Sequence, residues 1–314
     1  MKEDFDFYSK TSLKSYNLDD KIRYQLKMLD SLDSYTRRHS ENVASITCRL
    51  CEYLKLGQGF TIYTTTCAYI HDIGKIFIPP EILQKPSKLT DEEYEIMKTH
   101  TTIGYKMCMK DPKLRPYAAG PLYHHEALNG TGYPNGVTAN KIPYEAQIIR
   151  VADEFEAITA KRQYKTHIGI IDTLNILINN TKPSQIKTIS DGFKIFSKEN
   201  NLGKIDRKIV KALFKVVIDD TEYEIASRES YLDYLKDEIK RFEEALVYYE
   251  KMQIARTEDK KEYFRQGAKM FLRGNENIDV IPSSLSELRE AYIARKKHLD
   301  QLFIELKQIK RLIV

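Results

Sequence analysis

Residues 71–83 read HDIGKIFIPPEIL, and they follow a stretch, residues 63–70, whose apolar pattern predicts a helix. Adjacent side chains on a helix point about 100° apart, so His71 and Asp72 both reach one site only if the end of the helix faces it. An Asp at such a helix end can bridge two cations through its two carboxylate oxygens, while a His fills a terminal position. Lys75 follows three residues later and can reach the same centre, where its ammonium would neutralise a phosphate oxygen.

Further imidazoles and a carboxylate lie on both sides of this stretch, in segments beside apolar helical patterns. They are His39 in YTRRHS, His100 in MKTH, the pair His124-His125 in HHEALNGTGYP, and Asp153 in VADEF. Imidazole and carboxylate ligands suit iron, manganese or zinc at a hydrolytic centre. A lone His on a helix is more often structural, and we interpret His167 and His298 in that way. Ordered clusters, two of which contain adjacent ligands, instead favour a metallohydrolase.

Composition excludes several other classes of protein. The net charge of +5 over 314 residues, with no basic cluster outside the C-terminal region, argues against a nucleic-acid polymer as partner. No apolar run approaches the roughly 20 residues that span a bilayer, so we expect no membrane segment. The N-terminus is acidic and unlike a secretory signal. Cys48 and Cys51 lie one turn apart in an amphipathic stretch, which favours core packing over redox chemistry. We therefore expect a cytoplasmic, reduced protein.

The pattern along the chain predicts an almost entirely helical protein. Thr90 and Glu93 form a capping-box pattern that opens a helix ending near His100. Residues 129–143, rich in Gly and Pro, are the one long irregular stretch, and a helix follows from Tyr144 to about Lys161. We predict an N-terminal lead-in at 1–19, a catalytic domain at 20–218 and a helical hairpin at 219–314.

The predicted hairpin carries apolar residues in alternating steps of three and four, which is the pattern of a coiled-coil seam. One run extends from Leu235 to Tyr249 and the other from Leu285 to Ile313. Pro282 and a capping-box pattern at Ser284 mark the predicted start of the second run. An intramolecular antiparallel pair and a homodimer through residues 219–314 bury the same stripe, and we favour the homodimer.

Five segments together resemble the HD-GYP phosphodiesterases, a branch of the HD phosphohydrolase superfamily. They are RHSENVA, HDIGKIFIPPEIL, KPSKLTDEEYEIMKTHTTIG, HHEALNGTGYPNG and KIPYEAQIIRVADEFEAITAKRQY, and the resemblance covers about residues 31–218. It implies an all-α, HD-type helical bundle that binds two or three iron or manganese ions. It also implies hydrolysis of cyclic di-GMP to linear pGpG and/or GMP by a metal-bridged hydroxide. Two alternatives stay open: hydrolysis of another cyclic dinucleotide such as cyclic GMP-AMP, and a catalytically silent nucleotide-sensing module.

The resemblance also implies a role for each matched residue. One metal would be held by His39, His71, Asp72 and Asp153, and the other by Asp72, His100, His124 and His125, with Asp72 bridging. Lys75 matches a phosphate-contacting lysine, and the remaining substrate contacts would be Tyr133, Glu156, Arg162 and Lys165. Members with a third metal carry Glu four residues before the first His. This chain has Tyr35 there, so we expect two divalent ions, iron or manganese first and zinc as a further option.

Overall fold

The computed structural model describes residues 34–160, 168–183, 202–274 and 276–313. Regular secondary structure in these ranges is helical throughout, apart from one isolated bridge between Asn129 and Thr138. The all-α prediction is therefore confirmed. The described residues divide into two compact units, with the boundary between Val216 and Val217. None of the described helices combines the length and apolar character needed to cross a membrane.

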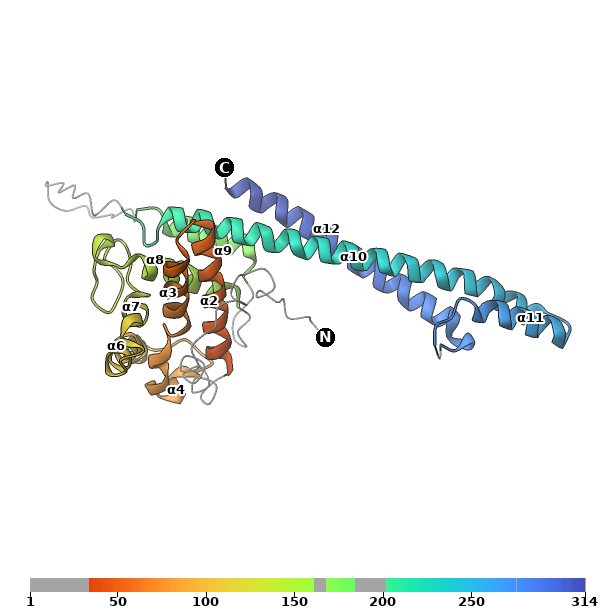
Figure 1. Cartoon of the computed structure of the whole chain (residues 1–314), viewed down its shortest axis with the longest axis horizontal. Coiled ribbons are helices and arrows are strands. Elements are labelled where there is room, and N and C mark those ends of the chain that lie inside the picture. The colour runs from red at the N-terminus through yellow and green to blue at the C-terminus, as the bar shows by residue number, and fades with distance from the viewer. Residues whose placement is uncertain (1–33, 161–167, 184–201, 275, 314) are drawn as a thin grey trace. The chain divides into compact units, whose positions relative to one another are not determined.

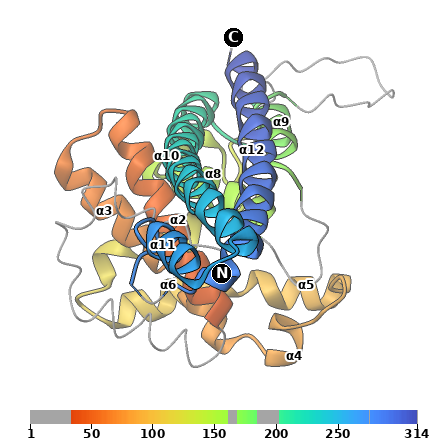
Figure 2. The same cartoon turned by 90° about the vertical axis from the view of Figure 1, so that its right-hand side faces the viewer.

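The described part of the first unit contains eight whole α-helices and the start of a ninth, with short 3-10 turns among them. In chain order the elements are α2 (Ser34–Tyr53), α3 (Gln58–Tyr69), η3 (Ile73–Phe77), α4 (Pro80–Leu83), α5 (Asp91–Lys98), α6 (His100–Lys110), η4 (Arg115–Tyr117), α7 (Ala119–Tyr123), η5 (Ala139–Lys141), α8 (Tyr144–Thr159), α9 (Ile170–Asn180) and the start of α10 (Arg207–Ile254). Helix α2 packs against both α3 and α8 (Figures 1 and 2).

Burial of one face of α2 explains this packing. Val43, Ile46 and Leu50, which the helical spacing places on one stripe, are almost fully buried. Cys48 and Cys51 are also buried and form no disulfide, and burial raises the pKa of each thiol to about 12. The prediction that these cysteines pack in the core is confirmed. Removal of this apolar area from water stabilises the first unit and holds α2 against α3 and α8.

Helix α5 begins as the sequence predicts. The Glu93 amide donates to Thr90 Oγ1 over 3.3 Å, and the Thr90 amide donates to Glu93 Oε2 over 2.8 Å, which completes a capping box. The helix ends at Lys98, and α6 begins at His100. His100 therefore lies at a helix start, where its Nδ1 reaches the Met97 carbonyl in the last turn of α5.

The second unit is a helical hairpin built from the rest of α10, α11 (Glu258–Lys269), η7 (Ile278–Val280) and α12 (Ile281–Leu312). Leu232 and Leu235 of α10 pack with Leu299 and Leu302 of α12. A second cluster, near the turn of the hairpin, joins Phe242, Ala245, Met252, Ala268, Ile278, Ile281 and Leu285. The two long helices are thus antiparallel, with α11 at the turn between them (Figure 1). Within one chain the predicted stripe is buried by an intramolecular pair, and the homodimer stays a prediction.

In this region one helix runs across the predicted domain boundary at 218–219, and one predicted helix start is wrong. Helix α10 continues without a break through Asp219 and Asp220. Helix α12 starts at Ile281 with Pro282 in its first turn, and the capping box predicted at Ser284 was wrong. Pro tolerates the first turn because the amide hydrogen that it lacks would have no partner inside the helix.

Close approach of two backbones holds η3 against α6. A Cβ atom on Gly74 would lie 1.9 Å from the His100 carbonyl oxygen and 2.6 Å from the Gly104 amide nitrogen. Only glycine fits there without displacement of the backbone. This contact brings Asp72, two residues before Gly74, next to the first turn of α6.

We predict that Gly74→Ala lowers the free energy of unfolding by about 1–3 kcal/mol, because the added methyl group overlaps backbone atoms of α6. Urea denaturation followed by far-UV circular dichroism measures this change. Gly59→Ala in α3 is the matched control, since a Cβ atom there meets nothing within 4 Å. Equal stability of the two variants would contradict the close-packing account.

Candidate metal centre

The turn between α3 and η3 carries His71 and Asp72. Helix α3 ends at Tyr69 and Ile70 caps it, so the pair leaves the regular helix before η3 begins at Ile73. The two side chains then reach the same centre, with His71 Nε2 3.3 Å from Asp72 Oδ2. The end of α3 therefore faces the site, as it must if the adjacent side chains of His71 and Asp72 are both to reach it.

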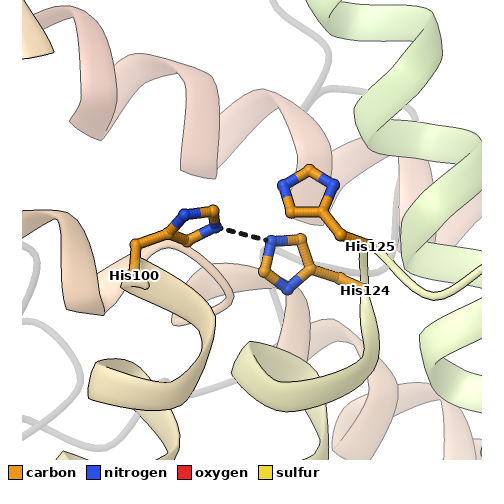
Figure 3. Close-up of side chains that lie close together, drawn as sticks. All are labelled: His100, His124 and His125. Carbon is orange, nitrogen blue, oxygen red and sulfur yellow. Dashed lines mark hydrogen bonds between the residues drawn. The ribbon is translucent and has the colours of Figure 1, made fainter. Parts of the chain in front are cut away.

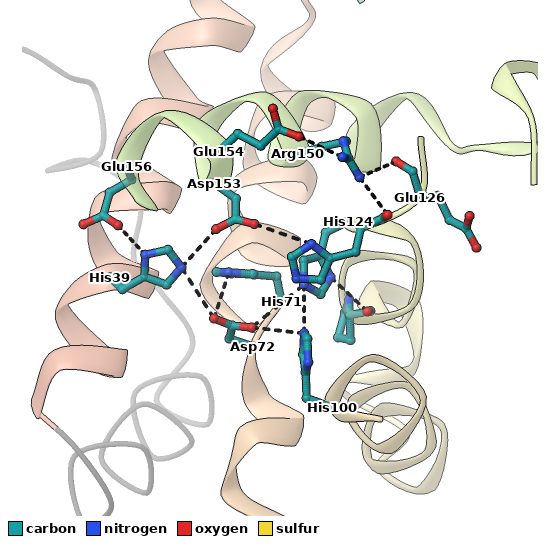
Figure 4. A network of polar contacts seen from close by, with 12 residues as sticks. His39, His71, Asp72, His100, His124, Glu126, Arg150, Asp153, Glu154 and Glu156 are labelled. Atoms are coloured by element: carbon teal, nitrogen blue, oxygen red, sulfur yellow. Dashed lines mark hydrogen bonds and ion pairs between the residues drawn. The ribbon is translucent and has the colours of Figure 1, made fainter. Parts of the chain in front are cut away.

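The Asp72 carboxylate lies at the middle of the cluster, and its two oxygens face different histidines (Figure 4). Oδ2 is 3.5 Å from His39 Nε2 and 3.3 Å from His71 Nε2. Oδ1 is 3.4 Å from His100 Nε2 and 3.8 Å from His124 Nε2. Such an arrangement lets one carboxylate contact two neighbouring positions at once.

Asp153 of α8 closes the cluster on the opposite side. Its Oδ1 is 3.1 Å from His39 Nε2, and its Oδ2 is 3.9 Å from His125 Nδ1. All the residues predicted as metal ligands therefore meet in one place, although they come from different helices and turns. Three overlapping groups have ligand atoms within 4.8 Å of one another: His39, His71 and Asp153; His71, Asp72 and His124; and His100, His124 and His125.

Burial keeps most of these imidazoles neutral. It lowers the pKa of His100 to about 4, and it lowers the pKa values of His124 and His125 well below their usual range. Neutral imidazoles have a lone pair to offer. His100 Nε2 and His124 Nε2 lie 3.2 Å apart, and the His125 ring stands beside them (Figure 3). Three nitrogen ligands therefore converge on one position.

Backbone carbonyls hold the outer nitrogens of the histidines. His71 Nδ1 donates to the Ala68 carbonyl over 2.6 Å, and His100 Nδ1 donates to the Met97 carbonyl over 2.6 Å. His124 Nδ1 donates to the Pro121 carbonyl over 2.9 Å. A carbonyl only accepts, so Nδ1 carries the hydrogen and Nε2 presents its lone pair to the centre.

His39 is held instead by a carboxylate. Its Nδ1 contacts Glu156 Oε2, and Glu156 Oε1 accepts from Asn42 Nδ2 over 3.1 Å. Burial alone would lower the pKa of His39, but the Asp153 and Glu156 carboxylates raise it to about 9. Glu156, predicted as a substrate contact, is only 6% exposed and lies behind His39. Its geometry is that of a residue that orients an imidazole.

Lys75 supplies the nearest positive charge. Its Nζ donates to Asp72 Oδ2, and its side chain stays partly exposed. Burial would raise the pKa of the Asp72 carboxyl, but Lys75 and His71 hold it well below its usual range. Lys75 thus keeps a buried carboxylate ionised and remains within reach of solvent.

The glycine-rich loop after the His124-His125 pair folds back onto it. A Cβ atom on Gly132 would lie 2.3 Å from the Ala127 amide nitrogen, so the loop contacts the backbone directly. The Tyr133 amide donates to the His125 carbonyl over 3.2 Å, and the Tyr133-Pro134 peptide bond is cis. The Tyr133 ring stacks on His125 with centroids 4.7 Å apart. This contact limits the rotation of the His125 ring, which is partly exposed.

Two residues that the sequence analysis missed hold this loop and the pair in place. Glu126, almost fully buried, accepts from the amides of Asn135 and Val137 over 2.6 and 3.1 Å. Arg150 Nη1 donates to the carbonyls of His125 and Glu126 over 2.7 and 3.0 Å (Figure 4). The available signals were local: Glu126 directly follows the pair, and Arg150 lies one helical turn before Asp153.

The remaining predicted residues fall in three places. Arg162 and Lys165, together with His167, lie outside the described residues. His298 is exposed on the surface of α12, in agreement with its prediction as a histidine without a ligand role. Tyr35 stacks nearly parallel to the His39 ring, with centroids 6.4 Å apart. Position 35 therefore places an aromatic ring, and no carboxylate, beside this histidine.

A comparison with protein-family models decides the family. The HD domain model matches residues 23–186, which is more than half of the chain. The chain belongs to the HD domain family. The family resemblance noted for the segments around HDIGK and HHEALNGTGYP is therefore confirmed.

Several curated relatives match 44–49% of this chain. A cyclic di-GMP phosphodiesterase of Thermotoga maritima is 42% identical over 146 residues, covering 45% of this chain and 40% of the relative. The 3'3'-cGAMP-specific phosphodiesterase 3 of Vibrio cholerae is 34% identical over 154 residues, covering 49% and 34%. The cyclic di-GMP phosphodiesterase response regulator RpfG of Xanthomonas campestris is 36% identical over 141 residues, covering 44% and 37%. The match thus spans 40% or less of each of these relatives.

We predict that Glu126→Gln loosens the loop of this HD domain, because an amide has one acceptor oxygen where the carboxylate has two. Hydrogen exchange of the Asn135 and Val137 amides should accelerate. A hydrogen bond to a charged group contributes about 1.5–3 kcal/mol, and the exchange rate should rise by the factor that corresponds to the loss of this free energy. Mass spectrometry of residues 126–140 measures it. Asp111→Asn is the control, since it removes a carboxylate that accepts from the Lys113 amide elsewhere. Unchanged protection of the loop in Glu126→Gln would contradict the assignment.

Proposed function

We propose that this chain is a metal-dependent phosphodiesterase that hydrolyses cyclic di-GMP to linear pGpG and/or GMP. One observation carries the proposal: the buried Asp72 carboxylate directs each of its oxygens at a separate set of histidines. A carboxylate in that position can bridge two cations, and a pair of cations is a common centre for phosphate ester hydrolysis. Relatives named as cyclic di-GMP phosphodiesterases support the choice of substrate.

The cluster fits divalent metals. Asp72 Oδ1 and His71 Nε2 are buried and have no hydrogen-bond partner, which is costly for polar atoms unless a ligand compensates it. The donors are imidazole nitrogens and carboxylate oxygens, a set that suits iron or manganese and also zinc. We propose that Asp72 bridges two ions. His39, His71 and Asp153 would hold one, and His100, His124 and His125 the other.

Bound divalent ions would lower the pKa of a coordinated water and offset negative charge on the phosphate. The chain itself contributes the geometry around them. Lys75, beside Asp72, would donate to a phosphoryl oxygen, where an ammonium stabilises charge that develops during hydrolysis. Tyr133 would line the substrate site next to His125. Arg162 and Lys165 stay predictions as contacts to the guanine base and phosphate.

A second candidate is hydrolysis of a mixed cyclic dinucleotide. The 3'3'-cGAMP-specific phosphodiesterase of Vibrio cholerae, at 34% identity, favours it. The clustered ligands do not distinguish the two substrates, because they would contact the phosphate rather than the base. A nucleotide-sensing module without turnover is a poorer fit to a complete ligand set. Product analysis by chromatography with cyclic di-GMP and 3'3'-cGAMP, on protein of measured metal content, separates the three functions.

We expect the double variant His71→Ala, Asp72→Ala to lose bound metal and phosphodiesterase activity, since it removes the bridging carboxylate and one terminal imidazole. Plasma emission spectrometry measures metal per chain, and circular dichroism checks that helicity is retained. His298→Ala, which changes an exposed histidine of α12, is the control for histidine loss. Undiminished turnover in the folded double variant would rule out the proposed centre.

We expect Glu156→Gln to weaken metal binding by about 10–100-fold, the usual effect of losing the residue that orients a ligating histidine. The amide cannot accept from His39 Nδ1 as strongly as the carboxylate does. Titration of the metal-free protein with manganese, followed by calorimetry, gives the affinity. Glu41→Gln is the matched control, because Glu41 lies on α2 near His39 but pairs with Arg37. If Glu156→Gln instead binds metal normally and only raises KM, Glu156 is a substrate contact after all.

A further inference from the structure

An aromatic and cationic cluster lies beside the candidate metal centre, and two of its members, Tyr94 and Lys98, have no role in the assignments above. Tyr94 and Lys98 come from α5, and Tyr133 comes from the glycine-rich loop. The two tyrosine rings meet edge to face, with centroids 6.4 Å apart and planes at 79°. Lys98 Nζ lies 4.8 Å from the Tyr94 centroid and 5.7 Å from the Tyr133 centroid. The two tyrosine rings and the Lys98 ammonium therefore lie next to one another.

This cluster is continuous with the metal centre. Tyr133 stacks on His125, and the Tyr133 centroid is also 6.5 Å from that of His100. The His125 side chain is 25% exposed, whereas that of His124 is fully buried. His125 therefore marks the side on which the centre approaches solvent, and Tyr133 lies on that side. A molecule with its phosphate at the centre would extend over Tyr133 toward α5.

The Tyr94 ring is open to solvent rather than packed into the core, because Tyr94 is 45% exposed. Lys98 is held near both rings by Glu95, to which its ammonium donates over 2.5 Å. The ammonium is therefore positioned beside the exposed ring before any ligand arrives.

We propose that Tyr94, Lys98 and Tyr133 form a nucleobase-binding platform of the substrate site. The proposal rests on the proposed function, since it names where one base of the cyclic dinucleotide lies. Aromatic side chains stack on any base, because every base has a π face. The Lys98 ammonium adds attraction toward an electronegative edge of the base. The platform would therefore contribute affinity for cyclic di-GMP and for 3'3'-cGAMP alike, and discrimination between them would come from other residues.

The test separates binding from catalysis. Loss of one stacking contact costs about 1–3 kcal/mol, so Tyr94→Ala should raise KM for cyclic di-GMP by about 5–150-fold while kcat stays within about twofold. Tyr94→Phe keeps the ring and should behave like the wild type. Lys98→Gln should raise KM less than Tyr94→Ala does. A drop in kcat at unchanged KM, or full activity of Tyr94→Ala, would overturn the platform.

A direct measurement of binding tests the platform independently of whether the chain hydrolyses the dinucleotide. Calorimetric titration of metal-free, EDTA-treated protein with cyclic di-GMP should show the same loss of affinity in Tyr94→Ala, with Tyr94→Phe unaffected. Tyr234→Ala is the matched control, because Tyr234 is 50% exposed and, like Tyr94, lies against a second tyrosine ring, here that of Tyr231 in the second unit. If the wild type binds but does not hydrolyse the dinucleotide, the phosphodiesterase function fails while the platform stands. Equal affinity of wild type and Tyr94→Ala, or no binding by either, overturns the platform.

Discussion

The first unit depends on one constraint, which is the burial of an ionised Asp72 carboxylate. Desolvation of a carboxylate costs several kcal/mol unless opposite charge or hydrogen-bond donors compensate it. Here Lys75 donates to one oxygen, and four imidazoles surround the group. These partners come from α2, the α3–η3 turn, the start of α6 and the end of α7. The ends of these elements therefore meet at this one side chain.

The surrounding structure restricts each partner to one orientation. Backbone carbonyls fix the outer nitrogens of three histidines, and Glu156 fixes that of His39. Glycine at position 74 lets η3 approach the backbone of α6 closely enough to bring Asp72 beside His100. Arg150 holds the carbonyls that follow the His124-His125 pair. Ligands that are oriented before binding lose little conformational entropy when a metal or substrate arrives.

The glycine-rich loop and α5 continue these orienting contacts from the candidate metal centre to the protein surface. Glu126 fastens the loop, and the loop carries Tyr133 onto His125. Tyr133 in turn meets Tyr94 and Lys98 on α5, whose start is set by the Thr90 capping box. A local sequence signal at residue 90 therefore has a consequence for the shape of the candidate substrate site. The second unit is a separate case, since its two long helices bury their apolar stripes against each other.

The sequence by itself determined the ligand types, the all-α class and several helix ends. Ligand chemistry, helical periodicity and capping are local properties that can be read from neighbouring residues, as at His71-Asp72 and Thr90. The length of α10 was less predictable, because this one helix runs across the domain boundary that the sequence predicts at 218–219. Only the tertiary structure showed that Glu156 lies behind His39, 117 residues away, and that Arg150 holds the backbone at His125. It also placed Tyr94 against Tyr133. Such contacts depend on how helices pack across the unit, and no local spacing encodes that arrangement.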